Sequence, residues 1–240
     1  MSTNSFFKKS ENTIYLEMED SFDFSCVNCG SCCHNNSGHT LTSYDIYRLA
    51  KKFKVSMSDI IHQYCRWDDK QFDPIIPVTL MNMQHTGYCS LYENGKCTAH
   101  SGKPIFCAIL PLNMGFGYEN ESILYSLMSE SQMPAGCSFV SKRYTLRDWL
   151  SEYNILENDP DIFSWYKTIV KLMDTPLIEM YRNGIDCSDV GDRVKKRVTN
   201  LLRKVLYIEY DTERPFSNQI ASNLDTALVE IETMYSELRV

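Results

Sequence analysis

The sequence predicts a mainly α protein: an irregular cysteine-rich region with a small β-hairpin, packed against a C-terminal helical bundle. Nine of the ten cysteines lie between Cys26 and Cys137, whereas the last hundred residues carry apolar side chains at helical spacing. Asn94-Gly95, between two short arms, is a hairpin-turn signal. We therefore divide the chain into a cysteine-cluster region, residues 1–140, and a helical region, residues 141–240, which could also form one continuous domain.

Capping residues and apolar stripes mark the helices of the helical region. Thr145, with an acidic residue three positions later, is typical of a capped helix start. Pro160 suits a first helical turn, and Pro176 should kink or restart that helix. Two further apolar stripes run through residues 194–208 and 220–238. Basic residues fall between the apolar positions of the first stripe, which favours a solvated face over a surface for an acidic partner.

The cysteine-cluster region also contains local structure signals. Capping boxes that begin at Thr42 and Ser56 predict two helices, because each is followed by aspartate three residues later and then by an apolar stripe. Residues 75–83 favour a β-strand. Pro104 is expected to begin a short helix that Pro111 ends.

Charge and hydropathy narrow the class of protein. The 24 basic and 31 acidic residues leave a net charge of −7, which disfavours a surface for nucleic acid. The first 24 residues have no apolar run typical of a secretory signal, and no stretch is long and apolar enough for a transmembrane helix. We therefore expect a cytoplasmic protein, where clustered thiols are more often metal ligands or catalytic groups than disulfides.

Four cysteines within eight residues form the strongest motif, Cys26-Val-Asn-Cys29-Gly30-Ser-Cys32-Cys33. Soft metals prefer thiolates, and a two-residue spacer lets one turn direct two sulfurs at one ion. Gly30 permits the backbone conformations that such a tight turn needs. If Cys32 and Cys33 are extended, their side chains leave opposite sides of the backbone and serve two ions or two corners of a larger cluster.

A second set of cysteines follows at Cys89, Cys97, Cys107 and Cys137. A hairpin at Asn94-Gly95 would bring the sulfurs of Cys89 and Cys97 close together. Together the two sets supply eight thiols, enough for two tetrahedral four-thiolate sites or two cuboidal iron–sulfur clusters. We therefore predict that the metal ligands are these residues: Cys26, Cys29, Cys32, Cys33, Cys89, Cys97, Cys107 and Cys137.

These motifs resemble the CxxCxxCC family, whose members are described as zinc- or iron-chelating domains. The segment Phe24–Cys33 and the expected helix over Asp45–Leu49 are similar to the family's opening cluster and its following helix. Residues 97–111 have the spacing of the family's C-x-I-Y-x-x-R-P-x-x-C-R-x-F-P segment. The resemblance extends from Phe24 to Cys137. It implies metal binding, and the related flagellin lysine N-methylases make protein modification a further expectation.

The chain departs from the family pattern at several positions. His100 stands where the family usually has tyrosine, Lys103 and Ala108 where it has arginine, and Leu110 where it has phenylalanine. Cys137 lacks the proline and glycine that usually follow the family's last cysteine.

The remaining candidates are weaker. His100 could be a nitrogen ligand or a hydrogen-bond donor to a cluster sulfur, but a packed surface histidine is the preferred interpretation, since the thiols already supply enough ligands. His34 and His39 flank the first cluster without ligand spacing. Cys65 and Cys187 are interpreted as small buried or unreactive thiols.

Three hypotheses for function follow. The first is a metalloprotein with an iron–sulfur cluster and a redox or protein-modifying role, because eight thiolates with an adjacent pair suit a polynuclear centre. The alternative is a structural interaction module in which two zinc ions replace a hydrophobic core. A third is an enzyme similar to the lysine N-methylases, with a protein substrate. Metal ions are the expected partners, no catalytic residue is identified, and whether the protein is an enzyme stays open.

Overall fold

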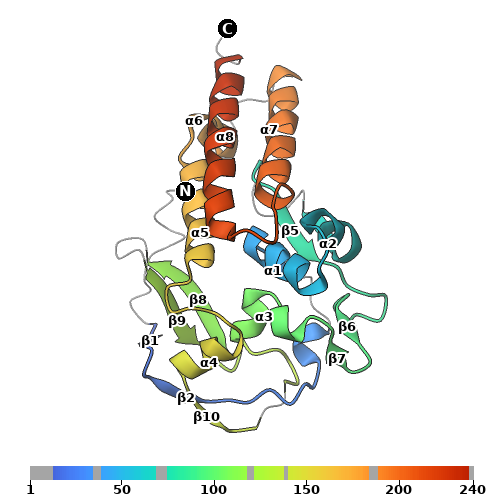
Figure 1. Ribbon diagram of the computed structural model, residues 1–240, viewed down its shortest axis with the longest axis vertical. Helices are drawn as coiled ribbons and strands as arrows, with labels where there is room; N and C mark the ends of the chain where they lie inside the picture. Colours follow the sequence, from blue (N-terminus) through green and yellow to red (C-terminus); the bar gives the residue numbers. More distant parts are fainter. Residues whose placement is uncertain are drawn as a thin grey trace. The chain divides into compact units, whose positions relative to one another are not determined.

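The computed structural model of the chain (Figure 1) describes residues 13–34, 39–68, 75–117, 122–137, 140–183 and 189–237. The chain divides into two compact units, each built from two stretches of sequence. Unit 1 comprises the residues up to His39 together with Met81–Phe163, and unit 2 comprises Thr40–Leu80 together with the residues from Ser164 onward. The proposed division at residue 140 into separate regions stays a prediction.

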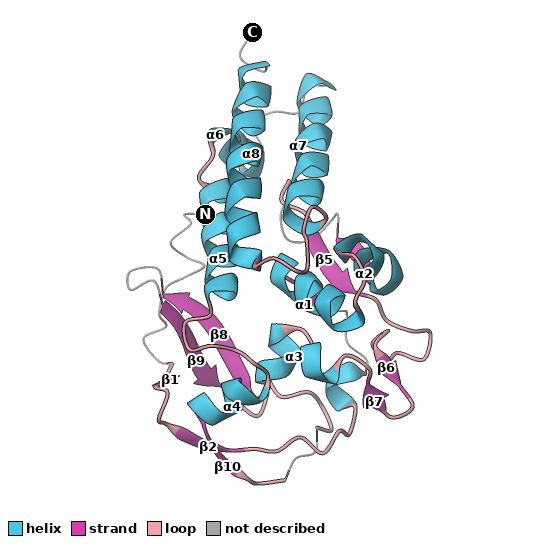
Figure 2. Cartoon of the chain, viewed as in Figure 1, coloured by secondary structure: helices cyan, strands magenta, loops and turns pink. Residues whose placement is uncertain are grey.

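The expected mainly α class is wrong, because the described chain has a mixed α/β structure (Figure 2). Beside the helices, strands of two to six residues form four small sheets in the described part. Most of these strands are too short for an alternation of apolar and polar residues to be visible in the sequence. One of the two longest strands contains Gly115 and Gly117, and glycine is depleted in strands, so its sequence does not favour a strand.

An antiparallel three-stranded sheet forms one part of unit 1. Its order is β1 (Tyr15–Leu16), β9 (Ser122–Leu127) and β8 (Leu112–Gly117). The pairing of β8 with β9 runs from Leu112 opposite Leu127 to Gly117 opposite Ser122. A separate pair joins β10 (Arg143–Thr145) to β2 (Ser21–Asp23).

Trp149 organises the core next to these strands. It lies on α4 (Leu146–Glu152), where Thr145 caps the helix start as expected by accepting a hydrogen bond from the backbone of Asp148. The rings of Phe22 and Phe24 meet Trp149 edge-on, with centroids 6.0 and 5.6 Å away. The indole nitrogen donates to the backbone oxygen of Ile109 at 3.3 Å. This core joins the β2 segment to the helix that carries Cys107.

The local elements expected around the cysteines are confirmed. The hairpin consists of β6 (Tyr92–Glu93) and β7 (Lys96–Cys97), which pair antiparallel around Asn94-Gly95. Cys107 lies on α3 (Ile105–Ile109), which follows Pro104 and ends before Pro111. Two 3₁₀ turns complete this part: η2 (Ser31–Cys33) and η3 (His100–Gly102).

Unit 2 contains the longer helices and a three-stranded sheet. The helices are α1 (Ser43–Phe53), α2 (Met57–Tyr64), α5 (Pro160–Met173, from Ser164 onward), α6 (Pro176–Arg182), α7 (Asp189–Tyr207) and α8 (Phe216–Glu237). The sheet has the order β3 (Thr40–Leu41), β5 (Val78–Met81) and β4 (Cys65–Asp68). The helix starts expected at Pro160 and Pro176 are confirmed, and both capping boxes of α1 and α2 are present.

The two longest helices pack on each other along their apolar stripes. Helices α7 and α8 lie side by side (Figure 1). Val198 and Leu202 of α7 and Ile220 and Leu224 of α8 are buried, in the pattern predicted from the sequence.

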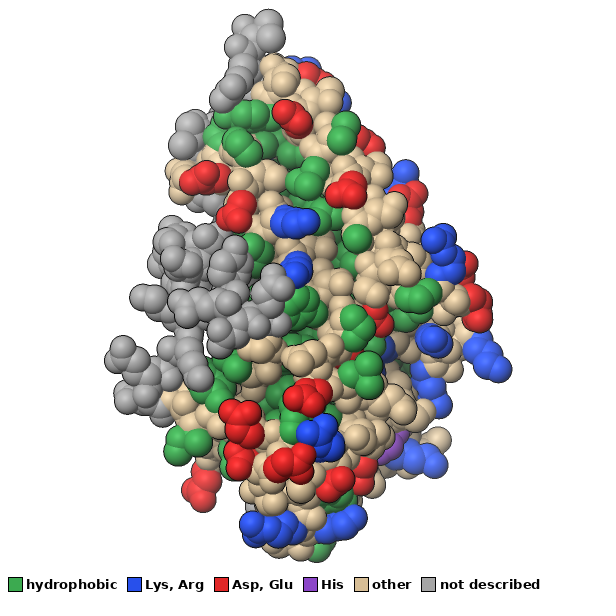
Figure 3. Space-filling view, turned by 60° about the vertical axis from the view of Figure 1, so that its left-hand side comes forward, with side chains coloured by type: hydrophobic (Ala, Val, Ile, Leu, Met, Phe, Trp, Pro, Cys, Tyr) green, Lys and Arg blue, Asp and Glu red, His purple; other side chains and the backbone are tan. Residues whose placement is uncertain are grey.

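The surface carries both signs of charge. On the face shown in Figure 3, acidic and basic side chains are interspersed with apolar ones. In the part of the chain that the structure describes, every helix is too short or too polar to cross a bilayer.

The capping box of α1 supplies a test of the local analysis. Replacing Thr42 by Ala removes the hydroxyl that accepts from the backbone of Asp45, so we expect the free energy of unfolding to fall by about 1 kcal/mol. Thr226→Ala, at an exposed position inside α8, removes only a hydroxyl bonded within the helix and should change stability by less than about 0.5 kcal/mol. Urea titration of both variants measures the difference, and equal losses would contradict the capping argument.

Candidate metal centre

All eight cysteines predicted as ligands lie in unit 1, and each keeps its thiol. Cys29 is exposed, and the other seven are partly exposed. Cys65 lies apart from them, buried on β4 of unit 2. Cys187 lies outside the described residues. The centre can therefore be described within one compact unit.

Two residues in the left-handed backbone region shape the first cysteine segment. Asn28 has a φ of 57° and Gly30 a φ of 78°, and the η2 turn follows directly. Because Cys32 and Cys33 lie in this 3₁₀ turn, they are not extended, and the condition for side chains on opposite sides is not met. Their sulfurs are 3.9 Å apart.

Backbone contacts attach the second cysteine set to the first. The amide of Cys89 donates to the carbonyl oxygen of Cys33 at 2.6 Å. The hydroxyl of Ser31 donates to the carbonyl oxygen of Gly136 at 2.8 Å, which holds the loop before Cys137 against η2. Residues far apart in the sequence are thus fixed beside the first four cysteines by hydrogen bonds to the main chain.

Five thiols influence one another's ionisation and so lie near each other. A hydrogen bond with Cys32, together with burial, raises the pKa of Cys33. The charges of Cys107 and Cys89 raise it further. Burial raises the pKa values of Cys89 and Cys97, and the charge of Cys32 adds to both effects. We call this set the five-thiol group: Cys32, Cys33, Cys89, Cys97 and Cys107.

The other three thiols form a second set. Burial raises the pKa of Cys137 to about 11, and both the charge of Cys29 and a hydrogen bond with its thiol act in the same direction. The charges of Cys32 and Cys26 add to the effect. We call Cys26, Cys29 and Cys137 the three-thiol group. Since Cys32 acts on members of both sets, the two groups adjoin at Cys32.

The pKa of the Cys32 thiol is lowered, whereas the pKa values of Cys33, Cys89 and Cys97 are raised. A hydrogen bond with the Cys33 thiol lowers the pKa of Cys32 to about 6, and the positive charge of Lys103 favours ionisation further. In this pair one thiol can therefore ionise more easily while the other keeps its proton and donates to it.

Backbone amides stabilise negative charge on three of the sulfurs. The amide of Asn28 lies 3.3 Å from the sulfur of Cys26, and that of Leu91 lies 3.5 Å from the sulfur of Cys89. The backbone of Ala99 bonds to Cys97 in the same way. In each case the donor is two residues after the cysteine. Amide bonds to sulfur favour thiolates, so this donor set fits a soft metal cation.

The thiols are gathered but do not stand in coordination geometry. Within the residues that the structure describes, no three His, Cys, Asp or Glu side chains are placed to hold one ion. A hydrogen bond is the main cause of the raised pKa of Cys33, and burial is the main cause for Cys89 and Cys137, but in all three the charges of neighbouring thiols add to the effect. Thiolates this close therefore repel one another. A bound cation would remove that repulsion, so the chemistry of the donor set fits a metal even though the sulfurs must close around it.

The comparison with protein families agrees with this chemistry. Residues 25–138 match the model of the CxxCxxCC family, described as a "Putative zinc- or iron-chelating domain". The matched residues include all eight cysteines of the two groups, and the resemblance noted in the sequence is confirmed. Neither a curated protein nor a solved structure matched the chain.

Three histidines of the CxxCxxCC domain contact aromatic rings. His100 is exposed and meets the ring of Tyr153 edge-on at 6.1 Å between centroids. The ring of His34 lies 4.3 Å from that of Tyr88. His39 lies 4.9 Å from the Phe106 ring, and its Nε2 is 3.3 Å from the backbone oxygen of Cys32. The preferred interpretation of His100 as a packed surface histidine rather than a metal ligand stays a prediction.

Two residues of the CxxCxxCC domain were not foreseen as parts of the site. Lys103 is only 9% exposed, although lysine is rarely buried. The only sign in the sequence that Lys103 could belong to the site was its place at a position where the CxxCxxCC family usually has arginine. Tyr92 covers Gly30 so closely that a Cβ atom there would lie 2.5 Å from the tyrosine oxygen. No sequence spacing relates Tyr92 to Gly30, because their contact depends on how the hairpin folds onto the η2 turn.

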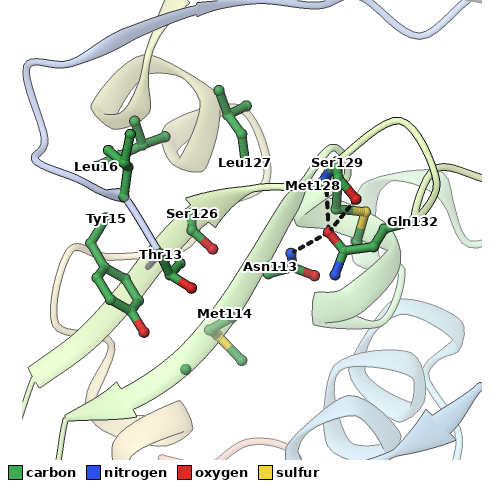
Figure 4. Close-up of a pocket in the computed structure, with 12 residues that line it drawn as sticks. Thr13, Tyr15, Leu16, Asn113, Met114, Ser126, Leu127, Met128, Ser129 and Gln132 are labelled. Atoms are coloured by element: carbon green, nitrogen blue, oxygen red, sulfur yellow. Dashed lines mark hydrogen bonds between the residues drawn. The ribbon is translucent and has the colours of Figure 1, made fainter. Parts of the chain in front are cut away.

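A separate pocket lies along the three-stranded sheet of unit 1 (Figure 4). Its volume is about 590 Å³, and Gln132 reaches into it to accept hydrogen bonds from Asn113 and Ser129. None of the residues that line it is a cysteine. Its lining comprises Thr13, Ile14, Tyr15, Leu16, Asn113, Met114, Gly115, Ser126, Leu127, Met128, Ser129 and Gln132. The pocket is therefore distinct from the thiol groups.

The contact of Gly30 with Tyr92 can be tested against a matched glycine. Gly95 has nearly the same φ, 79°, but a Cβ atom added there would have no neighbour within 4 Å. Gly95→Ala should therefore cost only the left-handed backbone, roughly 1–2 kcal/mol of unfolding free energy. Gly30→Ala should cost more, because the ring of Tyr92 must also move. Denaturant titration measures both variants, and equal losses would contradict the close packing of Tyr92 on the η2 turn.

Proposed function

We propose that the CxxCxxCC domain binds two metal ions, each through four cysteine thiolates. Site I comprises Cys26, Cys29, Cys32 and Cys137. Site II comprises Cys33, Cys89, Cys97 and Cys107. The observation that carries the proposal is the gathering of all eight thiols of unit 1 into two adjoining groups.

The division follows from the position of Cys32. The five-thiol group holds one thiol more than a tetrahedral ion needs, and the three-thiol group holds one fewer. Cys32 is the member of the five-thiol group whose charge also acts on Cys137. Assigning Cys32 to the three-thiol group therefore supplies each ion with four ligands. The adjacent cysteines then serve different ions, as the sequence suggested, although they do so from a 3₁₀ turn.

Zinc suits these sites better than cuboidal iron–sulfur clusters. Two thiolates bound tetrahedrally to one zinc ion, at about 2.3 Å from it, lie about 3.8 Å apart. The thiols of Cys29 and Cys137 are already in hydrogen-bond contact. A cuboidal cluster binds one cysteine at each iron, which sets its thiolates farther apart. The sulfurs of Cys32 and Cys33, which belong to adjoining sites, are also close, at 3.9 Å. Such close thiols fit adjoining zinc sites with less separation than cuboidal clusters require, so the iron–sulfur hypothesis becomes the alternative.

A structural role for the metal is supported by how little apolar surface two of the ligand-bearing segments bury. The η2 turn has no buried residue, and neither strand of the β6–β7 hairpin has one. Apolar burial contributes little to holding these segments in place. When bound, the ions would supply that stabilisation, because the binding energy of a structural metal site is folding energy. A methyl-donor site and a protein partner stay predictions, and calorimetry with a methyl donor tests the former.

Elemental analysis of the protein purified without oxygen tests the proposal directly. We expect a colourless protein with about two zinc ions per chain, because two four-thiolate sites are present. A brown protein that contains iron and inorganic sulfide would instead support the iron–sulfur alternative. A folded chain without either metal would contradict both.

Serine substitutions test the assignment of ligands. Cys29 is exposed, so Cys29→Ser removes little packing, and loss of one metal ion would come from the missing ligand. Cys107→Ser should lose the ion of site II. Cys65→Ser, at a buried thiol of unit 2, is the control and should keep both ions even where stability falls. Native mass spectrometry counts the ions on each variant, and metal loss in Cys65→Ser equal to that in Cys29→Ser would overturn the assignment.

A further inference from the structure

The pocket along the three-stranded sheet of unit 1 has a buried hydroxyl in its lining. Ser126 lies on β9, the middle strand, and it is 6% exposed. Its side chain points into the pocket (Figure 4). Among the residues that the structure describes, none forms a hydrogen bond with the hydroxyl of Ser126. Because a buried hydroxyl without a partner is costly, a ligand that bonds to it is favoured.

The sheet leaves room for a ligand beside Ser126. Tyr15, Ser126 and Asn113 lie opposite one another across the three strands, so their side chains share one face of the sheet. Gly115 lies on the same face, two residues after Asn113, and a Cβ atom added there would have no neighbour within 4 Å. The volume of the pocket, about 590 Å³, is in the range of small-molecule sites.

Two amide groups at the edge of the pocket place a hydrogen-bond donor beside an acceptor. The Nδ2 of Asn113 donates to the Oε1 of Gln132 at 3.4 Å, and that oxygen also accepts from the backbone amide of Ser129 at 2.8 Å. These contacts leave the Oδ1 of Asn113 and the Nε2 of Gln132 without a partner in the described part of the chain (Figure 4). An amide on a ligand matches this pair, because its N–H would meet the acceptor and its C=O the donor.

The lining of the pocket disfavours charged ligands. All the residues that line it are uncharged, so an ion brought into the pocket would lose water without gaining a counter-ion. Much of the remaining lining is apolar. It includes Met114 and Met128, whose flexible thioethers can adapt to an apolar group.

We propose that this pocket binds a small neutral molecule in which an amide group is joined to an apolar body. The amide pairs with Asn113 and Gln132, the hydroxyl of Ser126 supplies a third hydrogen bond, and the apolar body fills the open space at Gly115. This inference goes beyond the proposed function and does not rest on it, since no cysteine lines the pocket.

Benzamide is the probe, because it joins an amide to an apolar ring. Benzoate is the matched control compound, with a carboxylate in place of the amide. In the full-length protein as purified, ¹³C-labelled methionine methyl groups report by NMR where each compound binds. We expect benzamide to shift the signals of Met114 and Met128 in a saturable way, with a dissociation constant of about 1 mM, as is reasonable for a ligand of this size. The signal of Met57, buried on α2 of unit 2, should not move. Benzoate should bind at least about 10-fold more weakly.

Three variants test the site without removing its supporting contacts. Gly115→Val fills the open space with a residue that favours strands, and it should weaken benzamide binding at least about 10-fold. Ser122→Val adds the same side chain on the same face of the sheet but outside the pocket, and it should match the parent chain. Gln132→Glu keeps an oxygen that accepts from Ser129 but removes the amide donor, so it should weaken binding by about 10-fold.

The outcomes separate this inference from the proposed function. The inference is overturned if benzamide leaves Met114 and Met128 unshifted up to its solubility limit, or if benzoate binds as tightly as benzamide. Undiminished binding to Gly115→Val would place the probe elsewhere and would also overturn it. A parent chain that holds no metal but still binds benzamide in this pocket would contradict the proposed function alone.

Discussion

Repulsion between neighbouring sulfurs is the constraint on which this region of the protein depends. Eight thiols adjoin in unit 1, and the charges of neighbouring thiols add to the hydrogen bond that raises the pKa of Cys33 and to the burial that raises the pKa of Cys137. The local fold nevertheless assembles them. A 3₁₀ turn, a hairpin and a short helix each deliver thiols to the same place, and backbone amides are aimed at three of the sulfurs. Such an arrangement becomes favourable once a soft cation balances the charge.

Features that depend on a few neighbouring residues could be predicted from the sequence. The capping boxes at Thr42 and Ser56 are present because each uses a side chain and a backbone group only three residues apart. The Asn94-Gly95 turn needs two residues in the left-handed region, and both have positive φ. The similarity of residues 25–138 to the CxxCxxCC family was also visible, because the motifs of that family are set by spacing along the chain.

Features that depend on distant partners could not be predicted. Strand β1 is two residues long and exists through its pairing with β9, more than a hundred residues later. Cys32 and Cys33 alternate only if the chain is extended, and the left-handed Gly30 starts a 3₁₀ turn instead. The burial of Lys103 depends on Tyr153, which the chain reaches fifty residues later. The division of the thiols into two groups could not be predicted either. It depends on how segments that lie far apart in the sequence fold beside one another.

Each unit is built from two separate stretches of the chain, and this has a consequence for how the chain is connected. Cys33 and Cys89 are joined through backbone hydrogen bonding in unit 1, yet the chain between them includes Thr40–Leu80, which belongs to unit 2. A metal ion bound by Cys33 and Cys89 would close this stretch into a ring, much as a disulfide does. Force applied at the two ends of the protein would then bypass the enclosed segment. Release of the ion, rather than rupture of a hydrophobic core, would be the event that opens it.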